Sequence, residues 1–375
     1  MTISAGASPF YRKLFGHVQD LGGLFNAHLH LDRAGTLDDV YLDDAGHRIL
    51  ESSFISLHEK HALISSLHAG PAYEDKDLER RINFYLDLMI DVGTRRADTM
   101  VDVTADDVGD TALTKLMEIK AARASQIDLR VGAYSPLGFT DDEPERWELF
   151  TRAARNADFI GALPEADDVR DYPGHIGFDE HCRRVLLLTQ ELDTFVHVHT
   201  DQRNEPGEDG TERLIQAVRE YGPIPAAGEE PAVWAVHMIS PSTYEEDRFR
   251  RLVDGLVECN IGVICCPSAA IGMRQLRPIR TPTYNSIPRV LELAEAGVAI
   301  RLASDNIADI CSPSTTANLM DEVFVLSHAI RFYHAGILAK LAAGKRLDPD
   351  ERAFVAAHLN ENAAEIEKAI AGDHD

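Results

Sequence analysis

Short apolar segments alternate with longer segments of helical period along most of the chain. The short segments are rich in β-branched and apolar residues, as strands buried on both faces are. They lie at 24–31, 99–104, 129–134, 159–163, 194–200, 233–239, 262–266 and 298–303. Helical patterns follow them at 78–90, 111–124, 144–156, 178–191, 211–220, 243–258, 286–296 and 316–333. Eight strands, each followed by a helix, predict an α/β protein of the (β/α)8 (TIM) barrel type.

The spacing of these segments also predicts the domain organisation. The chain has 375 residues, enough for one large barrel, and contains no linker rich in Pro, Gly or Ser. We expect a single domain over 1–375, with a barrel core at 24–334 and a helical tail at 335–375. The segment 36–70 is long for a strand-to-helix loop, and it is long enough to cover a pocket.

Composition narrows the classes of function. The net charge is −25, from 37 basic and 62 acidic residues, which argues against nucleic acid or an anionic membrane as a partner. No apolar run approaches the roughly 18 residues of a membrane span, and the N-terminus lacks the apolar core of a signal peptide. Five cysteines without a CxxC pair indicate free thiols in a reducing compartment. We therefore expect a cytoplasmic protein with a small-molecule substrate.

Histidine and aspartate side chains gather at the predicted carboxyl ends of four strands. In a barrel of this type these ends meet at one rim, where the active site lies. Residues i and i+2 of a strand share a face, so each HxH pair presents two imidazoles together. The residues are His28 and His30, His197 and His199, His237, and Asp305. A single histidine is more often a packing residue, but delivery of all of them to one rim favours a shared site for a divalent metal such as Zn, Fe or Mn.

Other groups of reactive residues carry less weight. Asp98, Asp102 and their neighbours read as a solvated loop with one rim partner. Cys265 and Cys266 read as packing residues, because no histidine adjoins them. Three arginines at 274, 277 and 280 either bind a substrate carboxylate or lie in a surface loop.

Seven landmarks, in this order, resemble those of a known family. They are HLHLD (28–32), MVDV (100–103), GALP (161–164), VHTDQ (198–202), WAVH (234–237), ASDNIAD (303–309) and TTAN (315–318). On these motifs the chain resembles the amidohydrolase superfamily, and within it the branch of cytosine deaminase and isopropylammelide amidohydrolase. The resemblance extends over about residues 24–334. It is specific for the superfamily, moderately specific for the branch, and not specific for a substrate.

The resemblance implies a role for each rim residue. His28, His30, His199 and Asp305 would hold one divalent transition metal, with Zn expected and Fe or Mn as alternatives. Asp305 would also be the general base for the attacking water, and His237 would polarise the substrate or stabilise the developing oxyanion. His197 is the alternative ligand from the fifth strand, or else a partner behind the ligands or a pocket wall.

Four departures from the family pattern concern the substrate and the accessory structure. Gln202 stands where cytosine-deaminating relatives have a proton-shuttling glutamate, and it cannot titrate. A different segment, beginning at Tyr134, follows the third strand. Glu165 follows the fourth strand, where binuclear relatives often carry a carboxylated lysine, so one metal is expected. Only 23 residues precede the first strand. We therefore expect a bare barrel without the family's accessory β-sandwich, completed by loops or by association into a homo-oligomer.

The combined prediction is a metal-dependent hydrolase that cleaves a C–N bond of a small, cyclic nitrogen compound. Metal-activated hydroxide would attack the carbon of this bond, with Asp305 and His237 as catalytic residues. The reaction would be deamination, amine release or amide hydrolysis. Gln202 is assigned to catalysis through hydrogen bonding. Contacts to the substrate are assigned to Glu165, Tyr134, His197 and Asn306. Two alternatives stay open: a decarboxylase or isomerase at the same site, and a catalytically silent binding protein.

Overall fold

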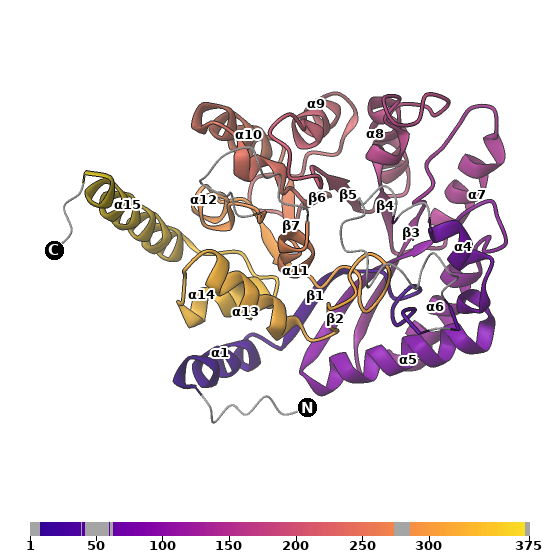
Figure 1. Cartoon of the computed structure of the whole chain (residues 1–375), viewed down its shortest axis with the longest axis horizontal. Coiled ribbons are helices and arrows are strands. Elements are labelled where there is room, and N and C mark those ends of the chain that lie inside the picture. The colour runs from indigo at the N-terminus through magenta and orange to yellow at the C-terminus, as the bar shows by residue number, and fades with distance from the viewer. Residues whose placement is uncertain (1–7, 39, 42–59, 61–62, 274–285, 372–375) are drawn as a thin grey trace.

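The computed structural model describes residues 8–371, apart from 39, 42–59, 61–62 and 274–285. Eight parallel strands lie side by side in sequence order, as neighbours in one sheet, with helices around them (Figure 1). The strands are β1 (Leu24–Leu29), β2 (Thr94–Asp102), β3 (Asp128–Tyr134), β4 (Phe159–Ala162), β5 (Val196–Thr200), β6 (Val233–His237), β7 (Gly262–Cys265) and β8 (Ile300–Leu302). The predicted (β/α)8 barrel is confirmed. All strands of the described segments belong to this sheet, and none of them forms a second one.

The barrel closes where the first and last strands meet. Leu29 forms an isolated parallel bridge with Asp305, just beyond β8, and the Asp305 N–H donates to the His28 carbonyl at 3.0 Å. Asn26 adds two bonds, from its Nδ2 to Ser304 Oγ at 2.9 Å and from Ser304 N–H to its Oδ1 at 3.0 Å. This seam places the end of β8 directly beside the HxH segment of β1.

Helices surround the barrel between successive strands. Those that follow β1 to β7 are α4 (Ile64–His68), α5 (Asp75–Asp91), α6 (Thr111–Arg123), α7 (Pro144–Ala154), α8 (Phe178–Glu191), α9 (Gly210–Tyr221), α10 (Glu246–Glu258), α11 (Pro267–Ile271) and α12 (Val290–Glu295). α1 (Pro9–Asp20) precedes the barrel, and α13 (Leu319–Ala329), α14 (Ala335–Ala342) and α15 (Pro349–Ala371) follow it. Short 3-10 turns lie at Pro71–Tyr73, Pro164–Asp167 and Ser240–Thr243. None of the described helices is long and apolar enough to cross a membrane.

Large side chains fill the inside of the barrel, and glycine makes room for them. A Cβ at Gly161 would lie 2.1 Å from the Met100 sulfur, and a Cβ at Gly262 would lie 2.4 Å from the Trp234 ring. Met100 packs in one buried cluster with Tyr134, Phe159, Leu163 and Ala166. The interior of the barrel is therefore a packed core.

The sequence prediction differs from the structure mainly at element boundaries. β2 begins at Thr94, five residues before the predicted start, because the Arg96 side chain is accommodated inside the sheet by Asp98 at 3.0 Å and by the Phe25 ring. The predicted helix at 316–333 begins at Leu319, where Asn318 caps it by accepting from Met320 N–H at 3.1 Å. α1, α4 and α11 were not predicted, whereas α14 and α15 lie within the predicted helical tail. The assignment of 1–375 to a single domain stays a prediction.

The tail contains α14 and the longer helix α15, which extends away from the barrel (Figure 1). Of the 23 residues of α15 only Val355 is buried.

Candidate active site

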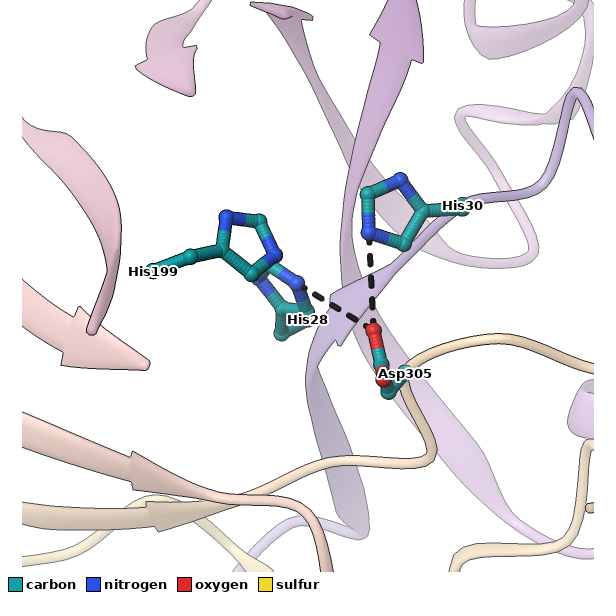
Figure 2. A group of neighbouring side chains, drawn as sticks. All are labelled: His28, His30, His199 and Asp305. Carbon is teal, nitrogen blue, oxygen red and sulfur yellow. Dashed lines mark ion pairs between the residues drawn. The ribbon is translucent and has the colours of Figure 1, made fainter. Parts of the chain in front are cut away.

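Four of the predicted ligands converge at the carboxyl end of the barrel. His28 lies on β1 and His30 follows its last residue, His199 lies on β5, and Asp305 lies in the segment after β8 (Figure 2). Each offers one ligand atom, and these atoms lie within 4.8 Å of one another. All four residues are buried. The parity rule for strands explains the convergence, since His28 and His30 share one face of β1.

The geometry around Asp305 fits a metal ion. Its Oδ1 lies 3.5 Å from His28 Nε2 and 3.4 Å from His30 Nε2. Within the described part of the chain, neither Asp305 Oδ1 nor His28 Nε2 has a hydrogen-bond partner. Buried polar atoms without partners are costly. Three imidazoles and one carboxylate are a donor set that suits Zn, Fe or Mn, so the residues present fit one such ion.

The buried surroundings of His30, His199 and Asp305 shift the pKa of each of these three groups. Burial lowers the pKa of His30 to about 3 and places the pKa of His199 well below its usual value. Burial alone would raise the pKa of Asp305, but His237 and the nearby rings of His28 and His30 hold it well below its ordinary range. These imidazoles are therefore neutral and the carboxylate is ionised near neutral pH.

His237 lies beside the group without joining it. Its Nε2 is 3.9 Å from Asp305 Oδ2, and its buried Nδ1 has no partner among the described residues. Burial lowers the pKa of His237 to about 4. His237 and Asp305 both take left-handed backbone conformations, with φ of 74° and 61°. Such strain in non-glycine residues is typical of functional sites, and it turns both side chains where their strands end.

The other nitrogen of each ligand ring faces a different kind of partner. His199 Nδ1 donates to the Ala162 carbonyl at 3.0 Å, which leaves the lone pair of Nε2 free. His30 Nδ1 lies 2.7 Å from Arg33 Nη2. A guanidinium only donates, so the neutral His30 ring carries its proton on Nε2 in this arrangement. To ligate through Nε2 as a neutral ring, His30 must carry its proton on Nδ1 instead, and Nδ1 could then no longer accept from Arg33. Asp102, 3.7 Å from Arg33 Nε, offers the guanidinium an alternative partner.

A buried polar network next to Arg33 was missed by the sequence analysis. His68, on α4, contacts Asp102 at 3.0 Å and Asp106 at 2.7 Å. Burial alone would lower its pKa, but these two carboxylates raise the pKa of His68 to about 9. Tyr73 donates to Asp32 at 3.1 Å and to Asp102 at 3.0 Å. The prediction of Asp102 as part of a solvated loop is wrong, because its side chain is fully buried. The apolar neighbours of Asp102 in the MVDV segment were the available signal.

Three residues assigned to substrate contact or catalysis, Tyr134, Gln202 and Glu165, have described contacts in the structure. Tyr134 packs against His30 and His199, with ring centroids 5.3 and 5.4 Å apart. Gln202 Nε2 donates to Glu165 Oε2 at 2.8 Å, and Glu165 is half-buried. Burial and the charge of Asp201 raise the pKa of Glu165 to about 7.

Two of the assigned residues have protein partners. His197 is fully buried under His28, and the Asn306 amide donates to Asp309.

The cysteine pair and the three arginines were the weaker candidates for reactive groups. Cys265 and Cys266 are fully buried, and burial raises the pKa of both thiols well above the usual value, which agrees with a packing role. The arginines at 274, 277 and 280 lie outside the described residues.

Comparisons with known proteins place this geometry in context. No family model matches the chain. A protein of Haemophilus influenzae described as uncharacterized is 28% identical over 277 residues, which cover 72% of this chain and 92% of that protein. A pterin deaminase of Rhizobium rhizogenes is 23% identical over 258 residues, which cover 69% of this chain. The match spans only 55% of the pterin deaminase, about half its length.

Solved structures show the same barrel. A 5-methylcytosine deaminase of Klebsiella pneumoniae, liganded with 5-fluorocytosine, superposes with a TM-score of 0.68 at 26% identity, over 82% of this chain and 69% of that one. N-isopropylammelide isopropylaminohydrolase of Burkholderia multivorans shares the fold, with a TM-score of 0.64 at 18% identity, over 86% of this chain and 74% of that one.

The barrel carries at its carboxyl end a group of His and Asp side chains that could bind a divalent metal, and its structural neighbours are enzymes that act on C–N bonds. The resemblance drawn from the sequence motifs is confirmed by these neighbours. In fold the chain is similar to amidohydrolase-superfamily deaminases, including a cytosine-type deaminase and an isopropylammelide hydrolase, and in sequence it is similar to a pterin deaminase. The predicted enzyme class, which acts on carbon–nitrogen bonds other than peptide bonds, is likewise confirmed.

Proposed function

We propose that the protein hydrolyses a C–N bond of a small, cyclic nitrogen compound, with release of ammonia or an amine. The observation that carries the proposal is the buried group of three histidines and Asp305, in which Asp305 Oδ1 and His28 Nε2 have no described hydrogen-bond partner. The solved neighbours that act on 5-methylcytosine and on N-isopropylammelide support the choice of substrate class. The pterin deaminase supports it as well.

The chain's own residues can carry the proton transfers of this reaction. His28, His30, His199 and Asp305 would hold one divalent metal, and Zn is the ion we propose. When bound, the metal would supply Lewis-acid polarisation and acidify water. The Asp305 carboxylate accepts the proton of the attacking water and later passes it to the leaving nitrogen. Neutral His237 offers a ring N–H to the oxygen on which charge develops.

We further propose that Glu165, Gln202 and Tyr134 contact the substrate ring. Glu165 holds its carboxyl against the Gln202 amide at 2.8 Å, and Tyr134 lies against His30 and His199. A carboxyl group accepts hydrogen bonds from ring N–H or amino groups, and an aromatic ring covers the face of a flat substrate. The Glu165 carboxyl group and the Tyr134 ring therefore favour a flat nitrogen ring that carries N–H donors. We propose no direct substrate contact from His197 or Asn306, because His197 is buried against His28 and the Asn306 amide donates to Asp309.

The direct test is product release from a panel of pterins, aminopyrimidines and aminotriazines. We expect zinc-loaded protein to release ammonia or an amine from at least one ring class, measured by a coupled ammonia assay and by mass spectrometry. Release of carbon dioxide without ammonia would contradict the proposal in favour of a decarboxylase. Binding of ring compounds without any turnover would favour a binding protein.

The raised pKa of Glu165 gives a prediction that needs no substrate. The folded pKa of about 7 lies above the ordinary value of 4.5, so the native state binds more protons than the unfolded state between these values. Stability from this group is therefore lost as pH rises from about 4.5 to 7. Glu165→Gln should raise the free energy of unfolding at pH 8 by about 1–3 kcal/mol relative to wild type, and change it little at pH 4.5. Urea denaturation at both pH values measures this.

Glu180→Gln is the matched control, because hydrogen bonds from Arg183 and Arg184 lower the pKa of Glu180 to about 2. This group stabilises the fold above its ordinary pKa, so the substitution should destabilise at pH 8. Equal responses of the two variants to pH would contradict the prediction for Glu165.

A further inference from the structure

His197 lies directly behind one of the proposed metal ligands. It is fully buried on β5, two residues before His199. Its Nδ1 is 3.3 Å from the Nδ1 of His28. Its ring packs beside Phe159 and Phe195, with centroids 4.7 and 5.4 Å apart. His197 thus contacts the side of the His28 ring that faces away from Asp305.

The close approach of the two Nδ1 atoms restricts the tautomers of both rings. One Nδ1 must donate and the other must accept. His28 Nε2 points toward Asp305 Oδ1 at 3.5 Å, and a histidine that ligates through Nε2 must carry its proton on Nδ1. His28 Nδ1 is then the donor, His197 Nδ1 is the acceptor, and the proton of His197 lies on its Nε2.

His197 bears a cost in this arrangement. Its Nε2 is buried and has no hydrogen-bond partner in the described part of the chain. An unpaired buried donor destabilises a fold, and phenylalanine in this aromatic surrounding would avoid that cost. A costly polar group that contacts a ligand ring and little else polar points to a role in the site.

We propose that His197 is a positioning residue, which fixes the tautomer and orientation of His28 so that the Nε2 lone pair is free for a metal. The inference rests on the proposed metal site. His197 does for His28 what the Ala162 carbonyl does for His199. The two histidines of the HxH pair on β5 therefore have different proposed roles: His199 is a metal ligand, and His197 positions the ligand His28.

The test compares His197→Phe and His197→Asn. Phenylalanine fills the space but accepts no hydrogen bond, whereas the asparagine Oδ1 can occupy the place of Nδ1 and accept. Zinc affinity is measured by competition with a chromogenic chelator, and the melting temperature is measured on metal-free protein. We expect His197→Phe to weaken zinc binding 10- to 100-fold, without lowering the metal-free melting temperature. His197→Asn should recover most of the affinity.

His181→Phe serves as the control. His181 is also buried with an unpartnered Nε2 among the described residues, but its Nδ1 contacts Asp167 at 2.6 Å, away from the ligand group. Its substitution should leave zinc affinity unchanged.

Zinc binding by folded His197→Phe that equals wild type would overturn the inference and leave the metal site intact. Equal loss of affinity in folded His197→Phe and His197→Asn would also overturn it. Failure of the wild type to bind any zinc would instead refute the proposed function.

Discussion

Asp305→Asn is expected to abolish turnover while the barrel stays folded. The substitution removes the negative charge that His28, His30 and His237 surround, and with it the acceptor for the proton of water. Loss of a general base alone costs about 10²- to 10⁴-fold in rate, and loss of a ligand adds to this. The seam should persist, because it uses the backbone of residue 305 and the Asn26 side chain.

The measurement is kcat on the best substrate of the panel, together with circular dichroism and a thermal melt. Asp98→Asn is a suitable control, because Asp98 is also a fully buried carboxylate, but it pairs with Arg96 in the sheet. It should leave turnover per folded molecule intact. Full activity in Asp305→Asn would contradict the assignment of Asp305 as the general base.

Removal of the metal should have the second largest effect. Protein purified without chelator is expected to contain about one transition metal per chain, and dialysis against chelator should abolish activity reversibly. Each of His28→Ala and His30→Ala should lose the metal on dialysis. Since a ligand that binds only the folded state stabilises it, metal at a thousand times its Kd should add about 4 kcal/mol to the free energy of unfolding.

Elemental analysis and thermal melts with and without zinc measure these effects. His334→Ala is the matched control, since His334 caps the distant helix α14 by accepting from Ile337 N–H at 3.1 Å. Full metal occupancy in both β1 variants after dialysis would contradict the site. Two metals per chain would redirect attention to Glu165 as a ligand.

The barrel and the convergence of ligands were accessible from the sequence because both follow from short-range rules. Buried strands and amphipathic helices leave local patterns, and His28 and His30 share a face by parity alone. The identity of Asp305 as their neighbour required one topological step, closure of β8 onto β1.

Other features depend on contacts that no local pattern encodes. Arg33 reaches His30 Nδ1, and His68 reaches Asp102 from a helix 34 residues away along the chain. Both pairings depend on contacts that form in the folded chain between residues that the structure describes. The start of β2 was missed for a related reason. A charged residue such as Arg96 indicates a loop, and its contacts with Phe25 and Asp98 are not evident from the local sequence.

The place where the barrel closes has a consequence for the life of the protein in a cell. β1 and β8 meet through one bridge at Asp305 and the side chain of Asn26, and two of the proposed ligands, His28 and Asp305, stand on opposite sides of that join. An ion bound by both residues would connect β1 to the segment after β8. Dissociation of the ion and separation of β1 from β8 would therefore be thermodynamically linked. Chains made during metal scarcity would then open more often and be cleared by proteases. The amount of this enzyme, and not only its activity, would follow the supply of its metal.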